Sequence, residues 1–187
     1  MLHAFAGPKR LVLVLLFLTA VPIIAAMMRA VQIPLGTLPE MAHHLQNTPY
    51  AHFLHALAGV SFGLIGPLQF AGVLKRKFGR AHRVMGRIYV AAGAILALSS
   101  LRLLATHLLG STPLLDIERA LAGLALGAAL WIALRAAMRR DITRHKAWMI
   151  RSYAVGMGSS TIVFVYFPYY LIMGEDPSPL AGDLLFL

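Results

Sequence analysis

Histidine is the residue type that most readily offers chemistry in this sequence, which has eight histidines and no cysteine. Five of them lie at or just inside the ends of long apolar segments: His52, His55, His82, His107 and His145. Neutral imidazoles bind metal ions and haem iron. Because cysteine is absent, any metal must be held by His, carboxylate or Met side chains.

The histidines divide into two levels. His55 and His107 belong to one end of the apolar segments, and His82 and His145 belong to the other. Imidazoles from two facing helices at one depth are the usual ligands of b-type haem in a bundle. We therefore predict His82 with His145 as an inner ligand pair and His55 with His107 as an outer pair. His82 and His107 are 25 residues apart, about 37 Å on a helix, so both haems would lie near the membrane interfaces.

A strip of glycines follows His55 at helical spacing. Gly59, Gly63 and Gly66 come four, eight and eleven residues later and share nearly one helix face. A flat macrocycle could lie on such a strip. The alternative is that the glycines let a neighbouring helix approach closely, as small residues often do in membranes.

Two basic segments resemble each other, and each precedes an apolar run. Residues 80–87 and 144–151 both place a histidine between basic residues, and each ends on a further arginine inside the following apolar run, Arg87 or Arg151. These arginines could bind haem propionates, lipid phosphates or an anionic substrate through bidentate contacts. The alternative is that they are interfacial anchors beside Trp148 and Tyr89.

The elements that must position these residues are membrane-spanning helices. The sequence is 59% hydrophobic and only 13% charged over 187 residues, and a span needs roughly 20 mostly apolar residues. We therefore predict an all-α integral membrane protein, a single transmembrane domain over residues 1–187 that forms a bundle of five helices. The predicted spans are residues 11–28, 51–74, 87–109, 120–138 and 148–173.

Basic residues predict the orientation of the bundle. With five spans, every Lys and Arg except Arg29, Arg102 and Arg119 falls on one side, which is expected to be cytoplasmic. The N-terminus is then cytoplasmic and the C-terminus outside. Membrane topology also explains the net charge of +10 better than nucleic-acid binding does. Arg102 lies inside an apolar run, where it would reach the outer surface towards Asp116 or Glu118, or pair with Gln69 or a histidine.

Familiar enzyme signatures are absent from the sequence. It has no phosphate-binding glycine loop followed by Lys, no His-Glu-x-x-His and no Gly-x-Ser-x-Gly. The predicted spans also lack the buried carboxylates that proton-coupled transporters commonly need. These absences leave open whether the protein is an enzyme.

Several motifs occur together between the second and fifth predicted spans. They are His55 with Gly66-Pro67-Leu68-Gln69-Phe70, His82-Arg83 with Gly86-Arg87-Ile88-Tyr89-Val90, Trp131, and His145 with Trp148-Met149-Ile150-Arg151-Ser152-Tyr153-Ala154. In order and spacing they resemble the multipass family catalogued as domain of unknown function 2306. Where members often carry another arginine in the last span, this chain has residues 160–164, Ser-Thr-Ile-Val-Phe. The resemblance implies a protein of the bacterial inner membrane in which His82, Arg87, His145 and Arg151 matter, and it implies no particular activity.

Two hypotheses of function follow. The first is a b-type haem-binding redox protein that passes electrons across or along the membrane, with a membrane redox partner or a second copy of the chain as partner. The second, from a different class, is a non-redox carrier or accessory subunit. Its His and Arg clusters would bind a small anion or a lipid headgroup.

Overall fold

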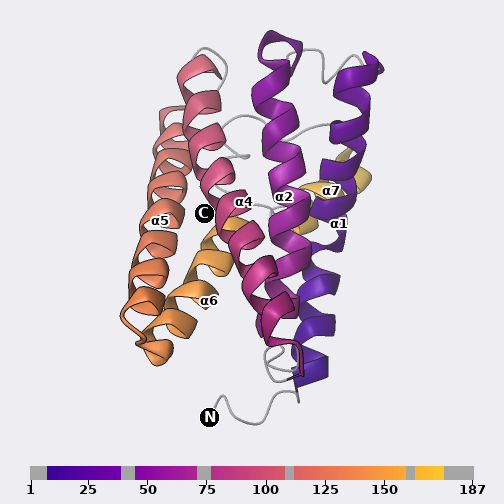
Figure 1. The fold of residues 1–187 in the computed structure, drawn as a ribbon. Helices are drawn as coiled ribbons and strands as arrows, with labels where there is room; N and C mark the ends of the chain where they lie inside the picture. The colour runs from indigo at the N-terminus through magenta and orange to yellow at the C-terminus, as the bar shows by residue number, and fades with distance from the viewer. Residues whose placement is uncertain (1–7, 39–44, 71–76, 108–111, 159–162, 175–187) are drawn as a thin grey trace.

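The computed structural model describes residues 8–38, 45–70, 77–107, 112–158 and 163–174. Within these residues the chain forms six α-helices (Figure 1): α1 (Pro8–Leu35), α2 (Pro49–Phe70), α4 (Gly79–His107), α5 (Pro113–Met138), α6 (Ile142–Gly158) and α7 (Val163–Met173). Three of them begin at a proline, whose fixed φ suits the first helical position and whose missing N–H costs nothing there.

Four of the described helices, α1, α2, α4 and α5, are long and apolar enough to cross a membrane. They correspond to the first four predicted spans, and α4 and α5 each begin about two turns earlier than predicted. The all-helical class and the membrane-protein prediction are therefore confirmed. Residues 71–74 and 108–109 of the predicted spans lie outside the described residues.

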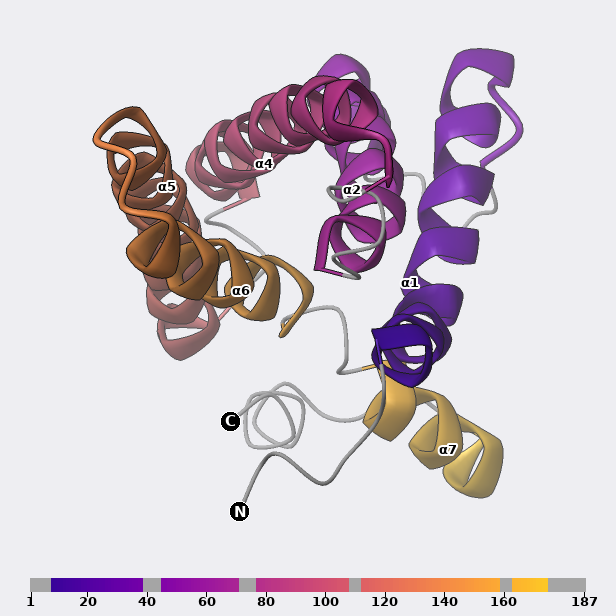
Figure 2. The same ribbon diagram turned by 60° about the horizontal axis from the view of Figure 1, so that its bottom comes forward.

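The predicted fifth span is divided between two helices. α6 ends at Gly158 and α7 begins at Val163. Their 17 and 11 residues correspond to about 25 and 16 Å, so neither reaches across a hydrocarbon core of about 30 Å. Figure 2 shows α7 outside the other helices, on the side of α1. The count of five spans and the placement of the termini on opposite sides stay predictions.

Four helices form a ring, which we call the helix ring: α2, α4, α5 and α6. α4 packs against α2 on one side and α5 on the other, α6 packs mainly against α5 and also touches α2, and α1 packs on the outside of α2. α4 and α6 therefore face each other diagonally. They approach near the middle of the ring and diverge towards their N-terminal ends (Figure 1).

Aromatic side chains fill the centre of the ring. Phe62 of α2 is fully buried, with its ring centroid 4.3 Å from that of Tyr89 and 5.8 Å from that of Tyr153. Gly93 and Gly156 make room for it, because a Cβ atom would lie 2.9 Å from Phe62 Cε2 at Gly93 and 2.7 Å from Phe62 Cε1 at Gly156. Contacts of this closeness hold α4 and α6 against one α2 side chain.

Candidate functional site

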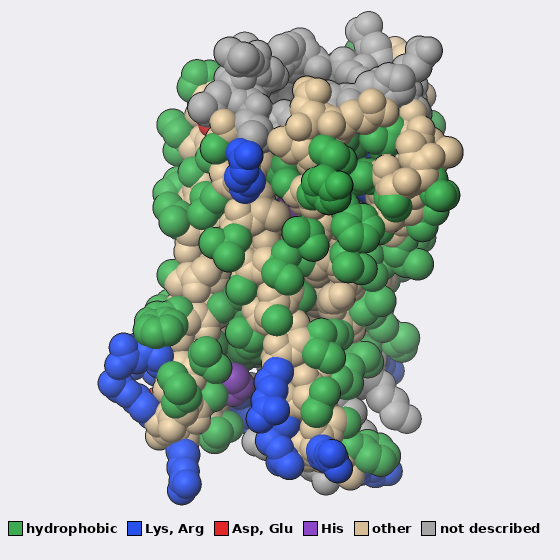
Figure 3. Space-filling model, turned by 45° about the horizontal axis from the view of Figure 1, so that its top comes forward, with side chains coloured by type: hydrophobic (Ala, Val, Ile, Leu, Met, Phe, Trp, Pro, Cys, Tyr) green, Lys and Arg blue, Asp and Glu red, His purple; other side chains and the backbone are tan. Residues whose placement is uncertain are grey.

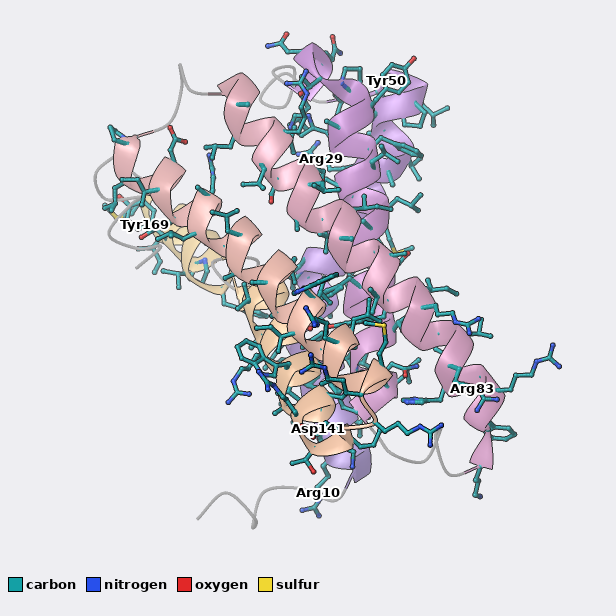
Figure 4. All side chains as sticks on the ribbon, turned by 60° about the vertical axis from the view of Figure 1, so that its left-hand side comes forward. Arg10, Arg29, Tyr50, Arg83, Asp141 and Tyr169 are labelled. Carbon is teal, nitrogen blue, oxygen red and sulfur yellow. The ribbon has the colours of Figure 1, made fainter. Side chains whose placement is uncertain are left out.

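Basic side chains gather at one end of the bundle, which we call the basic end. Arg10, Arg83 and Asp141 lie at this end, and Arg29 and Tyr50 lie at the opposite end (Figure 4). The described Lys and Arg side chains that belong to the basic end are Arg10, Lys77, Arg80, Arg83, Arg87, Arg135, Arg139, Arg140, Arg144, Lys146 and Arg151. The segregation of charge predicted from the sequence is therefore present in the fold.

The only carboxylate among the described residues of the basic end belongs to Asp141. Its Oδ1 accepts a hydrogen bond from the Arg144 backbone N–H at 3.0 Å, which makes Asp141 the N-cap of α6. Asp141 follows directly on Arg140, which has a φ of 61°. The Asp141 side chain caps the start of α6, so most of the positive charge around it has no acidic partner among the described residues.

His145 lies in the first turn of α6 and is half-buried. Its Nδ1 is 2.9 Å from the carbonyl oxygen of Ala133 in α5. Because a carbonyl only accepts, the Nδ1 atom donates this hydrogen bond, which directs the lone pair of the neutral tautomer to Nε2. Metal-binding histidines commonly have this support from a backbone carbonyl.

His82 lies in the first turn of α4, and its Nδ1 atom is shielded from solvent. It comes seven residues before Tyr89, just as His145 comes seven residues before Ser152. Tyr89 and Ser152 are hydrogen-bonded at 3.1 Å. Seven residues make about two helical turns, so His82 lies on the same side of α4 as Tyr89, and His145 on the same side of α6 as Ser152, each two turns nearer the basic end. Since α4 and α6 diverge in that direction (Figure 1), the two histidines belong to opposite walls of the ring.

Figure 3 shows one histidine side chain at the basic end, recessed between two groups of Lys and Arg side chains. One group lies over the start of α4, and the other over the turn between α5 and α6. The surface therefore places an imidazole between two sets of cations. Such a set of donors suits an anion.

The two outer histidines lie at different heights. His55 Nδ1 is 2.9 Å from Ser99 Oγ in α4, and Ser99 donates its own proton to the Leu96 carbonyl. His107 is the last residue of α4, eight residues after Ser99 and so about 12 Å farther along the helix. Its side chain lies outside the described part of the chain. This offset favours the inner pair over the outer pair as a haem site.

Arg87 and Arg151 are both exposed on the outside of their helices. The Arg151 guanidinium carbon is 5.0 Å from the centroid of the Trp148 ring, a cation–π contact of the kind expected at a membrane interface. Neither side chain is buried in the helix ring. The two arginines are therefore placed to meet groups that approach from outside the ring.

The glycine strip of α2 is covered by side chains. A Cβ atom would meet Leu96 at Gly59, Ile23 and Met157 at Gly63, and the Tyr153 ring at Gly66. The prediction that a macrocycle lies on this strip is therefore wrong. The alternative is confirmed, because α1, α4 and α6 each approach α2 through the space that the glycines leave.

Arg102 is exposed in α4, near the end opposite the basic end. It lies 16 residues after Gly86, about 24 Å along the helix. Gln69 Oε1 would be 3.7 Å from a Cβ atom at Gly86. The proposed pairing of Arg102 with Gln69 is therefore wrong, since the two side chains lie towards opposite ends of the bundle.

Gln69 is the polar residue whose importance the sequence analysis missed. It lies in the last turn of α2 with 9% of its surface exposed. Its Nε2 atom is buried and has no hydrogen-bond partner among the described residues. The sequence did carry a signal for it, because Gln69 is a polar residue near the end of an apolar run and within a Gly-Pro-Leu-Gln motif.

No three His, Asp or Glu side chains in the described part of the chain gather closely enough to hold a bare metal ion.

The family model described as "Predicted membrane protein (DUF2306)" covers residues 52–184. No curated protein matches the chain, and no solved structure matches it. The matched region contains α4, α5, α6 and α7 and all of α2 except its first three residues.

Proposed function

Because the chain belongs to the DUF2306 family of predicted membrane proteins, we propose that it is a membrane binding protein, a carrier or accessory subunit, whose basic end takes a phosphate-bearing anion. The observation that carries this proposal is the recessed histidine between two groups of cations (Figure 3). Arginine and lysine from three helices supply the donors, and the one described carboxylate at this end is occupied with capping α6.

Phosphate oxygens suit these donors for physical reasons. Guanidinium groups bind phosphate through paired, charge-assisted hydrogen bonds, which are about twice as strong as neutral ones. Exposed arginines such as Arg87 and Arg151 lie about two turns after the starts of α4 and α6, and an unpaired charge within the membrane is costly. An anion that neutralises them would lower this cost.

Binding to lipid nanodiscs tests the proposal. Wild-type protein in phosphatidylcholine discs should bind added short-chain phosphatidic acid, and Arg87→Ala and Arg151→Ala should weaken that binding several-fold. Arg29→Ala is the matched control, because Arg29 lies at the opposite end and donates to Gln32 Oε1 at 2.9 Å. Equal affinities for all four proteins, or no binding by the wild type, would sink the proposal.

Haem binding is the second candidate function, with electron transfer across or along the membrane as its consequence. The hydrogen bond from His145 Nδ1 to Ala133 supports it, because Nε2 is left as an iron ligand. His82 would be the second ligand, which requires the diverging ends of α4 and α6 to enclose the porphyrin. Protein purified in mild detergent should then show a Soret band that His82→Ala and His145→Ala remove, whereas His52→Ala, at the opposite end, should keep it. A colourless preparation from haem-replete cells rejects this candidate.

Either function would operate in the bacterial inner membrane, with the basic end facing the cytoplasm. The segregated Lys and Arg residues support this orientation. A fifth crossing would require α6, α7 and residues 159–162 to act together as one broken span. An odd number of spans would leave the C-terminus outside.

A further inference from the structure

We propose that Gln69 is the buried hydrogen-bond donor of the anion site and binds a phosphate oxygen through its Nε2. This inference rests on the function proposed above and names a residue deeper in the bundle than the exposed arginines. Gln69 has 9% of its surface exposed, and no described residue accepts a hydrogen bond from its Nε2.

A buried amide without a partner is costly, because it has lost its bonds to water and gained none in exchange. An amide nitrogen only donates, so its missing partner must be an acceptor. The described surroundings of Gln69 supply none. The acceptor therefore lies outside the described residues, as a bound water, an oxygen atom of a ligand or an atom in another part of the chain.

The position of Gln69 places this donor beside the basic end. The amide oxygen of Gln69 would lie 3.7 Å from a Cβ atom at Gly86 of α4, which is one helical turn after His82. Gln69 is also the second-last residue of α2, so it lies where that helix reaches the basic end.

The surrounding charge favours an anionic acceptor over a neutral one. Arg83 and Arg87 follow His82 on the same helix, and Asp141 is the only described carboxylate of this end. A phosphate oxygen would therefore accept from the Gln69 amide within a strongly positive field, as charge-assisted hydrogen bonds do. The phosphate group is the shared chemistry of a lipid headgroup and a free phosphate ion.

Three variants of Gln69 test this role in the full-length chain in phosphatidylcholine nanodiscs. Gln69→Leu keeps the size of the side chain and removes the donor, Gln69→Glu replaces the donor with a negative charge, and Gln69→Asn keeps an amide on a shorter stem. Each protein is titrated with short-chain phosphatidic acid and, separately, with inorganic phosphate. Binding of the first probe alone indicates a lipid headgroup as the source, and binding of both indicates phosphate as such.

We expect Gln69→Leu to weaken phosphate binding roughly tenfold or more, as for loss of one hydrogen bond to a charged group. Gln69→Glu should weaken phosphate binding further, because its carboxylate repels the phosphate. Gln69→Asn should weaken phosphate binding least of the three variants. Without ligand, Gln69→Leu should unfold at the same temperature as the wild type or higher, because an unpaired buried donor has gone.

Three results would overturn the inference. Unchanged affinity in Gln69→Leu, alongside weaker binding in Arg87→Ala and Arg151→Ala, would mean that the amide binds only water while the proposed function stands. A lower unfolding temperature of ligand-free Gln69→Leu would mean that the amide has a structural partner. Wild-type protein that binds neither probe would reject the proposed function and this role with it.

Discussion

The Tyr89 hydroxyl of α4 lies 3.1 Å from Ser152 Oγ of α6, and this hydrogen bond joins the two diagonal helices of the ring. Ser152 donates its own proton to the Met149 carbonyl at 2.8 Å, so the Tyr89 hydroxyl is the donor. Both side chains are fully buried. The bond therefore sets the height at which α6 is held against α4.

Tyr89→Phe should lower the free energy of unfolding by about 1 kcal/mol, the usual net contribution of one hydrogen bond. The ring stack on Phe62 would remain, so the fold should persist. Equilibrium unfolding in mixed detergent micelles measures the change. Tyr50→Phe is the control, because Tyr50 is 83% exposed and its variant should match the wild type. Equal stability of the two variants would contradict a role for this bond.

Gly66→Ala should destabilise the protein by about 1–3 kcal/mol, the range for overpacking a filled core. Its new methyl group would overlap the Tyr153 ring and lie 3.2 Å from Tyr89 Cε2. Gly127→Ala is the matched control, because a Cβ atom there meets no described atom within 4 Å. The same unfolding measurement should find it neutral or slightly stabilised. A reversed order of the two variants would mean that α6 does not pack here as described.

Arg140→Gly should stabilise the protein by about 1 kcal/mol. Arg140 has a φ of 61° in the turn after α5, where Asp141 N–H donates to the Ala136 carbonyl at 2.9 Å in the manner of a Schellman cap. Glycine adopts this conformation without strain. Arg139→Gly tests the specificity of the effect. The Arg139 N–H donates to the Arg135 carbonyl as in a helix, so Arg139→Gly should lower the stability of the protein. A loss in Arg140→Gly would show that the arginine side chain contributes more than the strain costs.

A topology reporter inserted in the turn at residues 139–141 should report the cytoplasm. The reason is the concentration of Lys and Arg at the basic end, which orients membrane proteins during insertion. A second reporter in the described residues 45–48, at the other end of the bundle, should report the opposite side. Reversal of both signals would invert the orientation. Identical signals at both sites would mean that α2, α4 and α5 do not all cross the membrane.

The sequence predicted the helices and the charge distribution of this protein better than the contacts between its side chains. Apolar runs of about 20 residues and the segregated Lys and Arg residues are local properties. Of the five spans predicted from them, four are helices long and apolar enough to cross a membrane, and the helical class and the basic end are also present in the structure. The glycines of α2 were also recognisable from the sequence as positions where a neighbouring helix could approach closely. The glycine spacing could not predict whether Gly66 faces a cofactor or the Tyr153 ring, because Tyr153 lies 87 residues away in the chain.

Hydropathy and charge along the chain determined that this is a helical membrane protein with one strongly basic end, because each helix must satisfy its own backbone in lipid whatever its neighbours are. Only the tertiary structure decided which residues meet. It divided the predicted fifth span at Gly158, filled the glycine strip with Tyr153 and Met157, and separated Arg102 from Gln69. These outcomes depend on close packing between helices, which is set by the shapes of several side chains at once and leaves no periodic signal in any one segment.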